Sequence, residues 1–433
     1  MKRSRSLVAV TALGVTALLA VGCGSSNPKA TTASGPSATS AAGSSGSSAS
    51  SSGSGSFTFP AAKKATGTPY MFGMINDESG AVTFPEARQG AIAAMQYVND
   101  YLGGINGHPI VIDNCIGDGT PATAARCANE LVAKHPLAIL GAADVGAPAS
   151  IPIYAHANLA YIGGIPFTPV PFTAPNSIQF WSISVGDNTA AAVYAGKTLG
   201  AKKVALMYFS NPQGESIIPQ VVPVFKAAGA TSVKLIPLSP TSPDPSPQAA
   251  LIQSSGADLA YIDVPNGCGN VLKSLKSVGY SGKLMGIDTC SAPPVISASA
   301  GGAEGMYIAA PYVLQTGTSQ QAELFQAAMK KWAAPGTLID SVSVAGFATV
   351  MNVQAALSKI SGTPTTESIL SAFKTGSDHP NFLSHPYTCN GQQMTGAPAI
   401  CNDYYLMNQI KDGVLTQPEP NNWITSKGYF KGL

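Results

Sequence analysis

Charged residues are scarce in this chain of 433 amino acids, and the usual enzyme motifs are missing. Asp, Glu, Lys and Arg together make up 11% of the sequence. There is no long basic run or arginine-rich segment, which argues against a nucleic-acid partner. No GxSxG, HExxH or P-loop motif occurs, and GCGNVL (267–272) lacks the last glycine of a dinucleotide-binding loop. The sequence therefore predicts neither an enzyme nor a cofactor.

The chain also lacks CxxC motifs and Cys/His clusters with zinc spacing, although it contains seven cysteines. One of these stands alone near the N-terminus. The others fall into three pairs that are close in sequence, and we expect each pair to form a structural disulfide in an exported protein. The expected pairs are Cys115–Cys127, Cys268–Cys290 and Cys389–Cys401. No metal site is predicted.

Residues 1–22 have the pattern of a signal peptide. Lys2, Arg3 and Arg5 precede an uncharged apolar run that is short for a membrane span and ends in small residues. The segment AVGC (20–23) resembles the lipobox of bacterial lipoproteins, which implies that Cys23 carries a lipid anchor in the cell membrane. The alternative is an ordinary secretory signal followed by an unrelated cysteine. Both interpretations place the protein outside the cytoplasm.

Residues 24–56 contain no aromatic and no large aliphatic side chain. Such a segment buries too little apolar surface to offset the entropy lost on ordering. A flexible Ser/Gly-rich chain of this length has an end-to-end distance of roughly 30 Å. We therefore expect residues 23–56 to be a disordered tether between the anchor and a folded part.

Residues 57–433 are too many for one ordinary core and suit two lobes. Short apolar runs alternate with helical patterns, which predicts parallel sheets covered by helices on both faces. The expected strands form two series, 69–75, 109–113, 137–141, 160–164 and 178–185, then 203–209, 232–237, 258–263, 283–287 and 305–310. Helices are expected around 319–333 and 340–361, and a hairpin from 403 onward. The fold class is α/β with two doubly wound lobes.

Several local patterns occur in an order that resembles a known family. They are SG (79–80), GAIAAMQYVND (90–100), GGINGHPI (103–110), ARCANELV (125–132) and YSGKLMGIDTCSAPPVISASAGGAEGMYIAAPY (280–312). Together they resemble the bacterial branched-chain amino-acid (Leu/Ile/Val) binding proteins, which have the type I periplasmic-binding fold and supply ABC importers. The resemblance implies a monomer with a ligand cleft between two lobes. It also implies lobe 1 from 57–185 and 312–380, and lobe 2 from 186–311, with 381–433 joining lobe 2 or the hinge.

Candidate ligand contacts lie where the predicted parallel strands end, because open α/β sheets bind ligands beyond these carboxyl ends. Asp288 falls where the family places an acid that pairs with a ligand ammonium; its alternative role is a helix N-cap. The turn 141–154 matches the one whose N–H groups hold the ligand carboxylate in the family. Gln213 replaces a family tyrosine. The full set is Ser79, Ala142, Asp144, Val145, Phe167, Gln213, Asp263, Asn266, Asp288 and Thr289.

The sequence departs from the family at the carboxylate-binding turn, where Val145 stands in place of a hydroxyl residue. The expected ligand is a small polar molecule, an amino acid or a related amine or amide. Because of this departure, small amides, polyamines, aromatic acids and short peptides all stay open as ligands. The expected function is capture of this ligand outside the cytoplasm and delivery to an ABC permease. Two alternatives remain open at this point, namely a ligand-sensing surface receptor of the same fold and a structural or adhesive surface protein.

Overall fold

A computed structural model describes residues 57–80, 82–265 and 267–432. The predicted signal peptide, Cys23, the tether and Asn266 lie outside the described residues. The described residues all belong to one compact unit. Within the described part of this unit, no helix is long and apolar enough to cross a bilayer.

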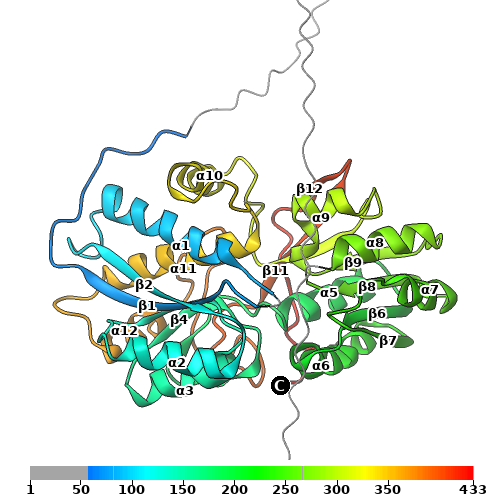
Figure 1. Ribbon diagram of the computed structural model, residues 1–433, viewed down its shortest axis with the longest axis horizontal. Coiled ribbons are helices and arrows are strands. Elements are labelled where there is room, and N and C mark those ends of the chain that lie inside the picture. The colour runs from blue at the N-terminus through cyan, green and yellow to red at the C-terminus, as the bar shows by residue number, and fades with distance from the viewer. Residues whose placement is uncertain (1–56, 81, 266, 433) are drawn as a thin grey trace, which may run out of the picture. The chain divides into compact units, whose positions relative to one another are not determined.

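The first sheet has five parallel strands in the order β2-β1-β3-β4-β5. The strands are β1 (Tyr70–Asp77), β2 (Ile110–Gly117), β3 (Ile139–Ala143), β4 (Tyr161–Ile165) and β5 (Ser177–Ile178). Helices α1 (Pro85–Tyr97) and α11 (Ser341–Leu357) cover one face, and α2 (Pro121–Val132) and α3 (Ala147–His156) cover the other (Figure 1). This arrangement is the doubly wound lobe that the sequence predicts.

Helix α11 is remote from α1 in sequence but packs directly against it. Glycines make this approach possible, because a Cβ on Gly90 would collide with the Ser343 carbonyl and one on Gly346 with the Ala87 carbonyl. Asp340 caps α11 by accepting a hydrogen bond from the Ser343 N–H at 2.9 Å. The contact brings the N-terminus of α11 to the carboxyl-terminal edge of the first sheet.

The second sheet repeats the winding of the first. Its parallel strands lie in the order β10-β9-β8-β6-β7, which is the order of the first sheet read from the other edge. They are β6 (Lys203–Phe209), β7 (Ser232–Leu238), β8 (Leu259–Asp263), β9 (Lys283–Gly286) and β10 (Tyr307–Ala310). The predicted hairpin, β11 (Tyr404–Lys411) and β12 (Val414–Thr416), extends the sheet antiparallel, and β13 (Ile424–Thr425) also pairs with β11. Two doubly wound sheets are thus confirmed.

The remaining helices complete the layers and the connections between the sheets. Around the second sheet lie α5 (Gly186–Lys197), α6 (Pro212–Ala228), α7 (Ser246–Ser254), α8 (Cys268–Ser277) and α9 (Pro293–Ala298). The short elements are α4 (Pro169–Thr173), the π-helical turn η1 (Val98–Leu102) and the 3₁₀ helix η2 (Asp288–Ser291). Helices α10 (Gln320–Trp332) and α12 (Thr366–Lys374) pack on the first core.

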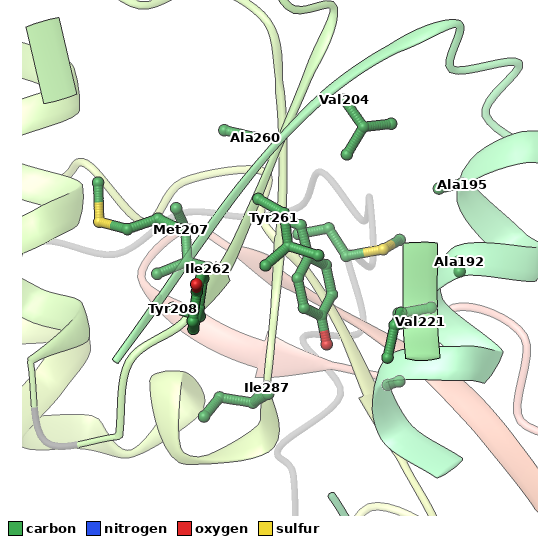
Figure 2. Close-up of a cluster of buried hydrophobic side chains, with 14 of the residues drawn as sticks. Ala192, Ala195, Val204, Met207, Tyr208, Val221, Ala260, Tyr261, Ile262 and Ile287 are labelled. Carbon is green, nitrogen blue, oxygen red and sulfur yellow. The ribbon is translucent and has the colours of Figure 1, made fainter. Parts of the chain in front are cut away.

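Alanines let helix α5 sit deep in the second lobe. Figure 2 shows Ala192 and Ala195 of α5 beside the buried strand side chains, with Val204 of β6 and Tyr261 of β8 among them. Small side chains shorten the distance between a helix and the layer it covers. Consequently all residues from Gly186 to Ala195 are buried, including the polar first turn of α5.

The prediction of a strand over 178–185 is wrong beyond its first residue. After Ile178 the backbone pairs with a segment that is distant in sequence. The Gln179 N–H donates to the Ala399 carbonyl, and the Gln179 carbonyl accepts from the Cys401 N–H. Ser184 then adopts a positive φ of 79°, which no regular strand has. The segment is a crossover that leaves the first sheet and leads into α5.

The three expected disulfides are present, Cys115–Cys127, Cys268–Cys290 and Cys389–Cys401. The first ties β2 to α2 within the first lobe, and the second joins α8 to η2. The third joins Cys389 to Cys401, 12 positions apart, and Cys401 belongs to the segment that pairs with Gln179 of the crossover.

Candidate functional site

One pocket is built from parts of both sheets. It lies at the carboxyl ends of strands β4, β6, β8 and β9 and at the N-termini of α5, α6 and α11. The space free of atoms is about 710 Å³, open solvent at its mouth included. Carboxyl ends of parallel strands are the usual place for ligands in doubly wound folds. The pocket is therefore the candidate binding site.

Three carboxylates line this pocket. Asp187 stands in the first turn of α5 and is 2% exposed, Asp263 ends β8, and Asp288 begins η2 and is 8% exposed. Among the described residues that line the pocket, none is Lys, Arg or His. The site thus concentrates acidic groups that no basic side chain of the described lining balances.

Burial keeps these carboxyl groups from ionising at their usual pH. Burial raises the pKa of Asp187 well above its ordinary value, and the charges of Asp288 and Asp263 raise it further. The pKa of Asp263 rises to about 6 through burial, opposed by a 3.0 Å hydrogen bond from the Asn188 side-chain amide. Burial also raises the pKa of Asp288 to about 6, opposed by the Ser341 hydroxyl. A cation entering the pocket would lower all three pKa values.

Several oxygen atoms of residues that line the pocket have no hydrogen-bond partner among the described residues. They include Oδ1 of Asp187 and Oδ1 of Asn188, on side chains that are 98% and 99% buried, and Oγ1 of Thr289. Buried polar atoms in folded proteins are nearly always paired, so unpaired oxygens on residues that line a pocket indicate a missing partner. The unpaired carboxylate and amide oxygens here need hydrogen-bond donors.

Apolar side chains form much of the remaining lining, beside polar residues such as Asn211, Gln213 and Ser341. Phe84 and Phe167 stack with ring centroids 5.3 Å apart, and Phe209 and Ile217 come from the second lobe. Ile165, Ile183, Ile287 and Val342 complete the apolar surface. The pocket therefore combines an acidic region with walls that favour an apolar or aromatic body.

A second set of strand ends, those of β1 and β3, has a different use. Asp77 accepts hydrogen bonds from the N–H of Val145 at 2.8 Å and of Gly119 at 3.1 Å. Asn76 accepts the Ala143 N–H at 3.2 Å, and Asp144 accepts the Ser150 hydroxyl at 2.7 Å. The chain's own side chains thus occupy backbone donors of the turn after β3.

The structure brings together half of the residues singled out in the sequence. Five of them line the pocket: Phe167, Gln213, Asp263, Asp288 and Thr289. Four others do not line it: Ser79, whose hydroxyl donates to the Gly117 carbonyl, and Ala142, Asp144 and Val145 of the turn after β3. Ligand contact by any of these residues stays a prediction.

Sequence reasoning missed Asp187, Asn188 and Ser341. The first two belong to the segment GDNTAAAVYA (186–195), where a polar triplet opens an alanine-rich helix. Because a strand was expected up to residue 185, this triplet was interpreted as the ordinary start of a helix. The density of alanine was the available signal, since it indicates a helix buried from its first turn.

Residues 69–413 match the sequence profile of the family described as periplasmic binding protein. The chain belongs to this family. Periplasmic binding proteins bind small molecules outside the cytoplasm and are not enzymes, as the sequence led us to expect. No curated protein sequence matches the chain.

Solved structures of periplasmic binding proteins share the fold at low sequence identity. A leucine binding protein from Thermotoga maritima is 17% identical with a TM-score of 0.67, over 82% of this chain and 98% of its own. A fatty acid ABC transporter substrate-binding protein from Thermomonospora curvata is 18% identical (TM-score 0.70; 85% and 96% covered). A solute binding protein of an ABC transporter from Rhodopseudomonas palustris, in complex with p-hydroxybenzoic acid, is 19% identical (TM-score 0.69; 83% and 97%). The type I two-lobed architecture is thus confirmed.

Proposed function

We propose that this periplasmic binding protein is a monomeric, lipid-anchored component of an ABC importer. It captures a small ligand with an amine group between its lobes and delivers it to the membrane permease. The observation that carries this proposal is the pocket between the two sheets, where Asp187, Asp263 and Asp288 meet no basic side chain of the described lining and Oδ1 of Asp187 has no hydrogen-bond partner among the described residues. An amine supplies both positive charge and hydrogen-bond donors to such a site.

The proposed lobes follow the boundaries expected from the sequence, with 57–185 and 312–380 in lobe 1 and 186–311 in lobe 2. The packing of α10 and α11 on the first core supports the return to lobe 1. The pairing of β11 with β10 supports a last segment that rejoins lobe 2. Three segments then cross between the lobes, and bending at them closes the cleft over the ligand.

Anchoring through Cys23 is tested by cell fractionation. Wild-type protein should be found in the membrane fraction, and the Cys23→Ser variant should be released from it. A variant that stays in the membrane fraction would overturn the lipid anchor.

Transport is tested by uptake. Cells that lack the gene should lose uptake of radiolabelled phenethylamine or leucine, and the wild-type gene should restore it while Asp288→Asn should not. Unchanged uptake of both compounds by the deletion strain would contradict an import role. The same result, combined with binding in vitro, would favour a sensing receptor.

A further inference from the structure

The charges and hydrogen bonds of the pocket narrow the ligand class within the proposed function. We propose that the pocket selects an organic cation without a carboxylate, namely a primary amine on an apolar or aromatic body. Its ammonium binds on the acidic side of the pocket, to which Asp187, Asp263 and Asp288 contribute carboxylates. This inference rests on the proposed binding function and adds a discrimination against amino acids.

The first argument is the state of Asp187. Asp187 lines the cavity and is 98% buried, and its Oδ1 has no hydrogen-bond partner in the part of the chain that the structure describes. An uncompensated buried charge costs several kcal/mol, which a paired and hydrogen-bonded cation offsets. The neighbouring unpaired oxygen of Asn188 adds a further acceptor for an ammonium, which has three donors.

The second argument is that the described lining offers no positively charged side chain to a ligand carboxylate. Its side-chain donors, such as those of Gln213 and Ser341, are neutral. The helix N-termini that reach the pocket could attract an anion, but α5 carries Asp187 in its first turn. The N-terminus of α6 is capped by the Asn211 side chain, which accepts the Gly214 N–H at 2.8 Å, and that of α11 is capped by Asp340.

The turn after β3 does not offer an alternative. Its Val145 N–H donates to Asp77, and its Ala143 N–H donates to Asn76. A ligand carboxylate there would have to displace an internal carboxylate and would be repelled by it. Asp77 therefore acts as a built-in anion at this turn.

The third argument separates an organic cation from a metal ion. Within the described residues, no three His, Cys, Asp or Glu side chains are grouped closely enough to hold a metal ion. The acidic region also faces the stacked pair Phe84–Phe167 and the side chains of Phe209 and Ile217. Contacts with these apolar side chains stabilise a bound cation that carries an apolar or aromatic group.

The test uses four compounds that differ mainly in charge on one phenyl-alkyl body. They are phenethylamine (cation), phenylalanine (zwitterion), 3-phenylpropionate (anion) and 2-phenylethanol (neutral). Full-length protein, freed of carried ligand by reversible unfolding, is titrated with each by calorimetry at pH 7.5. We expect phenethylamine to bind at least tenfold more tightly than each of the other three.

Variants assign the effect to residues. Asp187→Asn, Asp263→Asn and Asp288→Asn should each weaken phenethylamine binding at least tenfold, while each keeps a cooperative thermal unfolding transition. Three separate sites keep the test informative if one variant does not fold. The matched control is Asp113→Asn. It removes a carboxylate that pairs with Lys134 and does not line the pocket.

The outcomes distinguish this inference from the proposed function. If phenylalanine or 3-phenylpropionate binds as tightly as the amine, the cation selectivity is overturned. The proposed solute-binding function would stand in that case. If none of the folded pocket variants loses affinity for phenethylamine, the assignment of the ammonium to these carboxylates is overturned. Absence of binding by all four compounds at millimolar concentration would overturn both the inference and the amine-binding function.

Discussion

Replacing Asp288 by Asn should stabilise the ligand-free protein while weakening its ligand binding. The carboxyl group is 8% exposed, and burial raises its pKa from 3.8 to about 6. At pH 7.5 this difference corresponds to a cost of about 3 kcal/mol for holding the ionised group in the folded state. An asparagine carries no such cost and is close in shape, so the free energy of unfolding should rise by up to about 3 kcal/mol.

The pH dependence of this gain follows from the sign of the shift. Because the folded-state pKa is raised, the folded protein binds more protons than the unfolded chain between about pH 4 and pH 6. The wild type therefore loses stability as the pH rises through this window, and the cost is constant above it. The advantage of Asp288→Asn should fall to about half at pH 5 and to roughly 0.5 kcal/mol at pH 4.

Guanidinium denaturation followed by tryptophan fluorescence measures this difference at pH 7.5, 5 and 4, with Asp113→Asn as the control. The control should show no gain at pH 7.5. The reasoning is refuted if Asp288→Asn is less stable than the wild type at pH 7.5, or if its gain does not shrink on acidification.

Three further predictions concern packing. Phe59→Ala should lower the free energy of unfolding by about 1–2 kcal/mol, because the Phe59 ring stacks on Tyr101 with ring centroids 5.0 Å apart. The control in the same denaturation assay is Thr58→Ala at an exposed position. Equal stability of the two variants would contradict the packing role of Phe59. Gly163→Ala should lower the free energy of unfolding by at least about 2 kcal/mol in the same assay, because Gly163 has a φ of +72° and an added Cβ would collide with Thr349. A loss below about 0.5 kcal/mol, the size of a surface-substitution effect, would contradict this prediction. Phe209→Ala should weaken phenethylamine binding about fivefold in calorimetry through lost apolar contact, and unchanged affinity would remove Phe209 from the wall.

Much of the fold was predictable because its signals are local. The strand expected at 203–209 coincides with β6, since a short apolar run between turn residues has few alternative structures. The hairpin β11–β12 and the three disulfides were equally accessible, because the partners are close in sequence. The two-lobe division followed from the restart of the strand–helix alternation.

The crossover at 179–185 was not predictable from its own residues. Its apolar pattern suits a strand, but the backbone hydrogen-bond partners of Gln179 are Ala399 and Cys401. Only the tertiary arrangement brings that segment alongside. The local pattern therefore favoured a structure that non-local pairing prevented.

The site was predictable only in part for a similar reason. Asp263 and Asp288 follow recognisable strands, so their place at the carboxyl edge could be read from the sequence. The role of Asp187 depends on how deeply α5 is buried, and the use of the Val145 N–H by Asp77 joins residues that are 68 positions apart. Neither depth nor such pairing leaves a local pattern.

Proton release on binding tests most directly whether the pocket carboxylates receive a cation. Phenethylamine is titrated into the full-length protein by calorimetry at pH 6, in two buffers with different ionisation enthalpies. At this pH Asp263 and Asp288 are partly protonated in the free protein, given pKa values of about 6, while the amine stays charged. The account predicts net release of protons, because the bound ammonium lowers the pKa of Asp187, Asp263 and Asp288. Binding with no proton exchange, or with proton uptake, would contradict it.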